Sequence, residues 1–549
     1  MPTCKNCQKQ FKIEKEDEDF YSTIKIPNPD YCPQCRMQLR LAHVNLINLY
    51  PTKCDLTNNP IITSYPKGVP FPIYNIKDWH SDKWQPLEYD QKYDFNRPFF
   101  DQYQDLLNKI PHPAIHTIYT SLQNSEYINA ATYLKNCYLI FDSDYDEDCY
   151  YGYSLQKDKD VMDAMRVRDS ELSYECIDCV NIYNCRYLQD SRNCNDCYFL
   201  YQCSSCQNCF GCVNLHAKQY CWFNKQLSQE DYNQKLIEIN LGSRKQIDDW
   251  SKKFEDYKKD FPKIAFHGYK NENITGDYLY NCKNAKDCFD SYGLENCRYI
   301  LAAFLPLKDS YDCFECGEDA SLLYQLTNSG FKLFNCKNSA FIFGSENIEY
   351  SQHIHSGGKD LFGCFGLRKQ SNCILNKKYT KQKYEEIKGK IMDQMKQTGE
   401  YGRFFPPELS PYGYNISLAG LYLPSNKESV IAKGFKWQDE ASEFQSSTYE
   451  VPENIKDVKD DILDDILADE NTGRNYKIIK QELEFYRLHN IPVPKKCFTE
   501  RHKDRLAKRP TRNIYQIKCA KCNKETKTTH NPEHVNNIYC QNCFKTEVY

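Results

Sequence analysis

The sequence predicts a mainly β protein: a parallel β-helix solenoid in two halves with helical inserts, flanked by duplicated zinc-ribbon modules at both termini. Three observations predict this fold class. Cysteines and other small residues recur at a constant spacing in the middle of the chain, a block of that middle repeats 152 residues later, and the two ends of the chain align with each other. Recurrent small residues are typical of solenoids, in which each coil packs against the next.

The two ends of the chain are copies of one module, expected at 1–80 and 471–549. Adding 465 to the numbering of the first copy aligns it with the second without a gap. Aligned pairs include Phe20 with Phe485, Arg36 with Arg501, Arg40 with Arg505, Cys32 with Cys497 and Cys54 with Cys519. We therefore expect the same local fold at both ends.

Each module has places for two four-cysteine sites, and each copy has kept a different one. Two CxxC pairs offer four thiolates to a tetrahedral ion, as in structural zinc sites that leave no open position. We therefore predict two structural zinc ions as cofactors. The predicted ligands are Cys4, Cys7, Cys32 and Cys35 for one ion, and Cys519, Cys522, Cys540 and Cys543 for the other. Cys54 and Cys497 are expected to be remnants.

The cysteines of the middle are expected to be packing residues. Written in lines of eighteen, the stretch 176–221 places Cys176, Cys194 and Cys212 in one column. Cysteine suits such stacked interior positions as a small, soft hydrophobic residue, and the preceding Asn or Asp suits a corner. In the second half the cysteines leave this register, so its coils must vary in length. An alternative is that the central thiols bind further metal.

The remaining boundaries follow from this pattern. The solenoid halves are expected at 121–227 and 266–378, and each ends with the same corner followed by a helix. Between them we expect a connector (81–120), a helical insert (228–265) and a helix with an irregular connector (379–450). An acidic helix is expected at 451–470, because Ile455, Val458, Ile462, Leu463 and Ile466 have helical spacing.

Charge is unevenly distributed along the chain. Residues 495–549 carry thirteen Lys and Arg against five Asp and Glu, a net charge of +8, whereas the whole chain is −4. A basic terminal module indicates an anionic partner, for which we predict nucleic acid, with RNA favoured. The acidic 453–470 segment is an alternative, internal partner. The predicted contacts are Lys495, Lys496, Arg501, Lys503, Arg505, Lys508, Arg509 and Arg512.

The acidic stretch "FDSDYDEDCYYG" (residues 141–152) raises the alternative of an enzyme. Its carboxylates could bind calcium or serve a carbohydrate-active enzyme, but the EF-hand pattern requires Gly and Glu where the chain has Glu147 and Tyr153. The chain has no nucleophile elbow, phosphate-binding glycine loop or HExxH motif. We therefore expect a solvated acidic corner, no enzymatic activity and no small-molecule substrate.

Cysteine usage and hydropathy suggest the compartment. The chain has no apolar run long enough for a membrane span, and its start lacks the apolar region of a secretory signal. Thirty cysteines without an export signal then indicate reduced thiols in the cytoplasm. We expect a non-catalytic scaffold in that compartment, with RNA as the leading partner. A protein adaptor that uses tyrosines of the solenoid surface is the alternative.

Several motifs resemble an uncharacterised family with zinc ribbons and a cysteine-rich solenoid, common in small-genome candidate-phyla bacteria. They are "CPQCRMQLRLA", "SDKWQPLEYDQKYDFNRPFF", "NCYLIFDSDYDEDCYYG", "EYGRFFPPELSPYGYN", "IIKQELEFYRLHNIPVP" and "CQNCFKTEVY". The resemblance covers nearly the whole chain and implies no established activity. It also implies a further CxxC near "NIKDWHSDKW", which this chain lacks.

Overall fold

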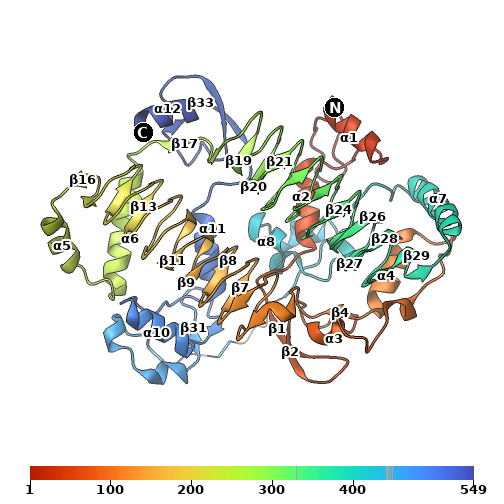
Figure 1. The fold of residues 1–549 in the computed structure, drawn as a ribbon, viewed down its shortest axis with the longest axis horizontal. Coiled ribbons are helices and arrows are strands. Elements are labelled where there is room, and N and C mark those ends of the chain that lie inside the picture. The colour runs from red at the N-terminus through yellow and green to blue at the C-terminus, as the bar shows by residue number, and fades with distance from the viewer. Residues whose placement is uncertain (329, 440–443, 446, 448, 549) are drawn as a thin grey trace.

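Two parallel β-solenoids form the body of the protein (Figure 1). A computed structural model describes residues 1–328, 330–439, 444–445, 447 and 449–548. The part of the expected 379–450 connector at 440–443, 446 and 448 lies outside these residues. The short helix α8 (Leu418–Tyr422) and the helices α2 (Pro33–Ala42) and α11 (Phe498–Ala507) lie between the solenoids in Figure 1. The predicted fold class is therefore confirmed.

Short strands build both solenoids. The first contains β5 (Leu122–Gln123), β6 (Leu134–Lys135), β7 (Tyr138–Phe141), β8 (Tyr150–Tyr153), β9 (Lys159–Met162), β10 (Met165–Arg168), β11 (Glu171–Tyr174), β12 (Ile177–Val180), β13 (Tyr198–Tyr201), β14 (Phe210–Val213), β15 (Cys221–Trp222) and β16 (Lys225–Gln226). The second contains β18 (Gly268–Tyr269), β19 (Gly276–Tyr280), β20 (Cys288–Tyr292), β21 (Leu294–Glu295), β22 (Leu307–Lys308), β23 (Ala320–Ser321), β24 (Leu333–Phe334), β25 (Ala340–Ile342), β26 (Ser345–Glu349), β27 (Gln352–Ile354), β28 (Lys359–Phe362), β29 (Ser371–Ile374) and β30 (Lys377–Lys378).

The coil of the first solenoid has twelve residues, not eighteen. Tyr138 pairs with Tyr150, and Tyr198 pairs with Phe210, each in parallel register. Left-handed backbone recurs at every third residue, for example at Asn136, Leu139 and Asp142, and the residue after each of these faces the interior. Four such corners close one coil. Because eighteen is also a multiple of three, the expected columns contain inward residues, but these residues lie on different sides of the coil.

Inward side chains satisfy inward backbone groups. Leu155 N–H donates to Ser143 Oγ at 2.9 Å, and Leu215 N–H donates to Cys203 Sγ at 3.4 Å, in each case across one coil. The thiol of Cys149 lies 3.3 Å from the carbonyl oxygen of Glu147. A buried N–H without a partner is costly, so a small side chain with an acceptor suits these positions better than a purely aliphatic one. The central cysteines therefore fill the interior and also pair its polar backbone.

The second solenoid has coils of variable length, as expected. Leu294 pairs with Leu307 thirteen residues later, whereas Leu333 pairs with Ser345 twelve residues later. Both solenoids end in the same antiparallel hairpin, β15–β16 in the first and β29–β30 in the second. A helix follows each hairpin and buries an equivalent tyrosine. These helices are α5 (Gln229–Ile237), which buries Tyr232, and α7 (Lys381–Thr398), which buries Tyr384.

The duplication of the ends holds element by element. The first module has α1 (Lys15–Thr23), α2, β1 (Tyr50–Lys53), β2 (Pro60–Thr63), β3 (Ile73–Tyr74) and α3 (Ile76–Trp79). The second has α10 (Lys480–Leu488), α11, β33 (Tyr515–Lys518), β34 (Glu525–Thr528), β35 (Ile538–Tyr539) and α12 (Gln541–Val548). Each element of the second list begins 465 residues after its counterpart in the first. One ancestral module therefore folds the same way at both ends.

Each module contacts both solenoids. In the first module β3 pairs with β4 (His112–Pro113), just before the first solenoid, while Arg36 of α2 reaches Asp312 of the second. In the second module β35 pairs with β17 (Lys263–Ile264), just before the second solenoid, while Arg501 of α11 reaches Asp163 of the first. The two halves of the molecule are thus joined crosswise.

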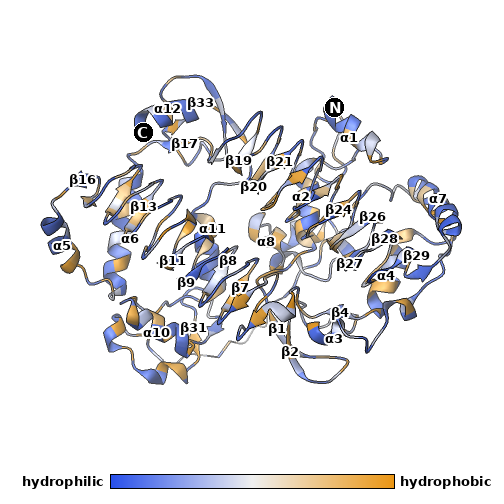
Figure 2. Ribbon diagram, viewed as in Figure 1, coloured by the Kyte–Doolittle hydropathy of each residue, from blue (hydrophilic) through white to orange (hydrophobic). Residues whose placement is uncertain are grey.

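The other helices are α4 (Phe99–Lys109), α6 (Arg244–Lys258) and α9 (Lys427–Ile431). Helix α4 packs on the second solenoid, where Phe99 contacts Phe362, and α6 packs on the first, where Phe254 contacts Phe199. Figure 2 shows hydrophobic residues along the strands of both solenoids, whereas α7 at the edge is mostly hydrophilic. Its few apolar residues, including Ile391 and Met395, are buried. These helix residues belong to a large hydrophobic cluster that the helices form with outward aromatic residues of both solenoids, separate from the two solenoid interiors.

The expected acidic helix at 451–470 is not formed. Two single-turn 3-10 helices, Ile455–Asp457 and Asp460–Leu463, and strand β31 (Leu467–Ala468), which pairs with β32 (Asn475–Tyr476), occupy the segment. Ile455, Val458 and Ile462 are buried, so the apolar spacing was a signal of burial rather than of a helix. A period of three to four residues does not separate these two states over so short a segment.

Candidate metal centres

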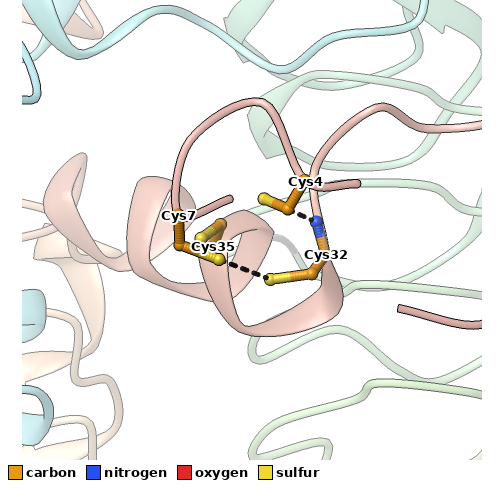
Figure 3. Close-up of side chains that lie close together, drawn as sticks. All are labelled: Cys4, Cys7, Cys32 and Cys35. Carbon is orange, nitrogen blue, oxygen red and sulfur yellow. Dashed lines mark hydrogen bonds between the residues drawn. The ribbon is translucent and has the colours of Figure 1, made fainter. Parts of the chain in front are cut away.

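The N-terminal site brings four thiols together, as predicted. Cys4 and Cys7 lie on a turn before α1, Cys32 caps the N-terminus of α2, and Cys35 lies in its first turn. Their four Sγ atoms lie within 4.8 Å of one another. In Figure 3 the thiols of Cys7 and Cys32, 3.8 Å apart, point toward each other. The backbone N–H of Cys32 donates to Cys4 Sγ at 3.3 Å.

The C-terminal site repeats this geometry. Cys519 and Cys522 lie on the turn between β33 and β34, Cys540 directly precedes α12, and Cys543 lies in its first turn. These Sγ atoms also lie within 4.8 Å of one another. Cys540 N–H donates to Cys519 Sγ at 3.2 Å, the counterpart of the bond from Cys32 to Cys4.

Both groups have the chemistry of structural zinc sites. Hydrogen bonding from Cys35 is the largest effect that lowers the pKa of Cys32, to about 5. Burial raises the pKa of Cys519, but the backbone N–H groups of Cys540 and Cys522 outweigh burial and lower this pKa to about 6. Thiolates bind zinc and thiols do not, and four sulfur ligands leave no position for a substrate. The protein therefore holds two structural zinc ions, one at each end.

The sites are treble clefs in form rather than zinc ribbons. In each site the first CxxC lies on a turn, and the second lies at the N-terminus of a helix. A CxxC spacing fits a β-turn and a first helical turn equally well, so spacing alone did not separate the two folds. Pro33, between Cys32 and Cys35, was the available signal, because proline is favoured at the first position of a helix.

The two sites differ in exposure to solvent. Cys4, Cys32 and Cys35 are buried and Cys7 is partly buried. At the C-terminal site only Cys519 is buried, and Cys522 is exposed. The C-terminal ion is therefore the more accessible of the two.

Hydrogen bonds replace metal at the two degenerate sites. At the first, Asn75 N–H donates to Cys54 Sγ at 3.3 Å. At the second, Asp469 stands where the first copy has Cys4, and it accepts from Cys497 N–H at 2.8 Å and from Thr472 N–H at 2.8 Å. One carboxylate thus holds the turn that a zinc ion holds in the other copy. Cys54 and Cys497 thus take part in hydrogen bonds within their own modules.

The arginines predicted to contact nucleic acid are internal. Arg501, Arg505 and Arg509 are 6%, 1% and 8% exposed. Arg501 Nε lies 2.9 Å from Asp163 Oδ1, and Arg505 Nη1 lies 2.7 Å from Glu175 Oε1. Burial alone would lower the pKa of Arg501, but the carboxylate of Asp163 raises it well above its ordinary value. These guanidinium groups hold α11 on the first solenoid and are not available to phosphates.

Arg509 and a further arginine, Arg512, meet one carboxylate between the solenoids. Arg509 Nη2 lies 2.5 Å from Asp290 Oδ1, and Arg512 Nη2 lies 2.8 Å from Asp290 Oδ2. Arg509 also pairs with Asp178 of the first solenoid. The internal partner of the basic run is therefore a set of solenoid carboxylates, not the acidic 453–470 segment.

The predicted lysines are at the surface in part. Lys495, Lys503 and Lys508 are exposed, whereas Lys496 is partly buried. Lys496 pairs with Asp504 at 2.8 Å, and Lys503 pairs with Glu500 at 2.8 Å. Of the predicted contacts, Lys495 and Lys508 thus remain as exposed charges for which the described residues provide no salt bridge.

A second set of lysines was missed. Lys518, Lys521, Lys524 and Lys527 lie on the hairpin of β33 and β34, and all four are exposed. The available signal was the alignment of the two ends, because the counterparts in the first copy are Lys53, Leu56, Asn59 and Ile62. The second module, which keeps its zinc site next to this hairpin, thus has three lysines that the first module lacks.

The acidic stretch does not converge on one site. Asp146 is 2% exposed inside the first solenoid and accepts Asp158 N–H at 3.0 Å, so the expected solvated corner is wrong for this residue. Glu147 pairs with Lys135 at 2.6 Å, and Asp144 accepts a hydrogen bond from Thr132. Within the described residues, only the two cysteine groups bring three or more potential ligands together.

Comparison with known proteins agrees with the form of the C-terminal site. A family model described as a probable treble clef zinc finger matches residues 512–548, which include all four ligands. No curated protein matches the chain. Among the helices of the described residues, none is long and apolar enough to cross a membrane.

Proposed function

We propose that the protein is a non-catalytic, zinc-binding scaffold that binds nucleic acid, with RNA favoured, through the exposed lysines of its C-terminal treble clef. The observation that carries this proposal is the lysine set of the β33–β34 hairpin, hereafter the finger lysines: Lys518, Lys521, Lys524 and Lys527. Thirty free cysteines support a reducing compartment such as the cytoplasm.

The arrangement of the finger lysines suits a polyanion. Side chains alternate across a strand, and the exposed positions of this hairpin are Gln516, Lys518, Glu525 and Lys527. Lys521 pairs with Glu547, but the described residues provide no salt bridge to Lys518, Lys524 or Lys527. The zinc ion fixes the turn that presents Lys521 and Lys524. Phosphate contacts of this kind are independent of sequence and sensitive to salt.

The test measures binding of a fluorescein-labelled single-stranded RNA by fluorescence anisotropy, with the zinc-loaded full-length protein. The triple variant Lys518→Glu, Lys524→Glu and Lys527→Glu should bind at least about tenfold more weakly and show a shallower dependence on salt. Reversal of Lys9, Lys25 and Lys53 is the matched control, because these exposed lysines of the first module also lack a salt bridge within the described residues and their reversal changes the net charge equally.

Equal weakening by the control triple would show that bulk charge, not the finger, attracts RNA. Absence of RNA binding by the native protein would refute the proposal. Charge reversal at Arg501, Arg505 or Arg509 is unsuitable as a test, because it would place carboxylates against Asp163, Glu175 and Asp178.

A protein adaptor is the second candidate, favoured by tyrosines on the first solenoid. Tyr133 and Tyr145 are 49% and 55% exposed, and their rings stack at 4.6 Å. Exposed aromatic side chains are typical anchors of protein interfaces. A partner retained after nuclease treatment by the native protein, and lost with Tyr133→Ser and Tyr145→Ser, would support this function.

A further inference from the structure

A ladder of tyrosines begins beside the C-terminal treble clef. Tyr269 of β18 pairs with Tyr280 of β19, and Tyr280 pairs with Tyr292 of β20, so that the three side chains follow one another along the second solenoid. Tyr269 and Tyr292 are 48% and 36% exposed, and Tyr280 is partly buried. The rings of Tyr269 and Tyr280 lie 5.0 Å apart. The protein thus presents successive aromatic rings at its surface.

Arginines of the first solenoid border this ladder. The guanidinium of Arg192 lies over the ring of Tyr269, 5.8 Å from its centre, and Arg192 is exposed. Arg168 lies two coils before Arg192 in the first solenoid, because Arg168 pairs with Val180 and Val180 pairs with Arg192. Arg192 and Tyr269 thus meet across the seam between the solenoids.

The ladder is continuous with the treble clef. Gln541 of α12 donates to Gly268 O at 3.2 Å, one residue before Tyr269. Strands β35 and β17 also pair, so the finger and the start of the second solenoid share backbone hydrogen bonds. In Figure 1, α12 lies next to β17, close to β19. A strand of nucleic acid bound to the finger lysines would therefore lie within reach of the ladder.

The buried carboxylates near the ladder have partners within the protein, so they do not repel a polyanion. Asp178 pairs with Arg509, and Asp190 accepts a hydrogen bond from the Tyr278 hydroxyl at 2.9 Å. His267 lies 4.0 Å from Asp190 and 3.0 Å from Asp277. These negative charges thus have internal partners.

We propose that Tyr269, Tyr280 and Tyr292, with Arg168 and Arg192, form a stacking platform for the bases of a single-stranded nucleic acid whose phosphates contact the finger lysines. The proposal rests on the proposed function and adds to it a preference for single strands. Every base has a π-face, so tyrosines can stack on a single strand of any sequence, and arginine adds cation–π attraction. The bases of a duplex stack on each other and cannot reach the platform.

The experiment compares variants of the zinc-loaded full-length protein by anisotropy with a twelve-nucleotide labelled RNA, the DNA of the same sequence, and the RNA duplex. Tyr269→Ala should weaken binding of the single strands about tenfold and leave the salt dependence and duplex binding unchanged. Tyr269→Phe keeps the ring and should bind like the native protein. Tyr145→Ala, an equally exposed tyrosine on the first solenoid, is the matched control.

The outcomes separate the two proposals. If Tyr269→Ala binds like the native protein while the finger-lysine triple binds weakly, the platform is refuted and the proposed function stands. If neither the native protein nor any variant binds any probe, both proposals are refuted. Equal loss of single-strand and duplex binding in Tyr269→Ala would also refute the platform.

A second readout avoids substitution. RNA that contains 4-thiouridine should cross-link, on irradiation of the native protein, to peptides that include Tyr269 or Tyr292. Cross-links confined to other parts of the chain would overturn the platform. Similar affinity for RNA and DNA assigns the platform to single strands in general, and stronger binding of RNA assigns it to RNA; either result supports it.

Discussion

Single side chains inside the solenoids fill the interior and also form hydrogen bonds with backbone groups. Asp146 accepts Asp158 N–H through Oδ1, but its Oδ2 is buried without a hydrogen-bond partner among the described residues. Burial raises the pKa of Asp146 well above its ordinary value of 3.8, and raises the pKa of Asp158 to about 8. A carboxyl with a raised pKa in the folded state ionises first in the unfolded state, so stability falls as pH rises above about 4.

We therefore expect Asp146→Asn to stabilise the protein at pH 8. The amide keeps the acceptor for Asp158 N–H and removes a buried group that resists ionisation. The gain should be on the order of 1 kcal/mol at pH 8 and vanish near pH 4. Thermal unfolding midpoints at several pH values would measure it. A lower midpoint at pH 8 would contradict this account.

The ligand residues predict the metal content. Native protein should contain two zinc ions per chain by elemental analysis, because the described residues form two four-thiolate groups. Cys543→Ser should lose one ion, whereas Cys54→Ser and Cys497→Ser should keep both, since the Cys54 thiol accepts from Asn75 N–H and Cys497 is held through its backbone N–H, which donates to Asp469. More than two ions in native protein would mean that the central thiols bind metal as well.

Among the elements, α2 and α11 have equivalent roles. Each presents two arginines to one fully buried aspartate of the opposite solenoid, Asp312 for α2 and Asp163 for α11. The alignment of the two ends contained this information, because Arg36 and Arg40 match Arg501 and Arg505. Residues that both copies share serve the common fold. Residues that differ between copies, such as the finger lysines, are better candidates for function.

Removal of either aspartate should destabilise the protein strongly, because a buried charge without its partner is costly. Asp312→Asn leaves Arg36 and Arg40 without a carboxylate and should cost about 3–5 kcal/mol of the free energy of unfolding. Asp163→Asn should cost less, because Glu175 still contacts Arg505. Asp19→Asn removes an exposed partner of Lys15 and should cost at most about 0.5 kcal/mol. Urea unfolding would measure all three, and equal effects would refute this ranking.

The sequence predicted the kinds of structural unit and their order along the chain better than the length of each solenoid coil. The two modules, the two solenoid halves with a common terminal corner, and all eight zinc ligands could be predicted, because alignment of the chain with itself needs no contacts. The coil length could not, because inward positions recur every third residue and any multiple of three aligns them. The internal ion pairs of Arg509 and Arg512 could not be predicted either, since their partners Asp178 and Asp290 are remote in sequence.

For the whole molecule, the crosswise docking makes the two ends interdependent. Neither module is confined to the half of the chain that encodes it, because each pairs a strand with the segment just before one solenoid and forms ion pairs with the other solenoid. The molecule therefore resembles a dimer of two related halves within one chain, and the two terminal modules join these halves.

This arrangement has a consequence for biosynthesis. The face of the first solenoid around Asp163 leaves the ribosome more than three hundred residues before α11, which covers it. At a synthesis rate of about 5–20 residues per second, roughly 15–70 seconds pass before α11 can cover that face. A nascent chain thus carries the buried carboxylate of Asp163 without its arginine partners until α11 has been synthesised.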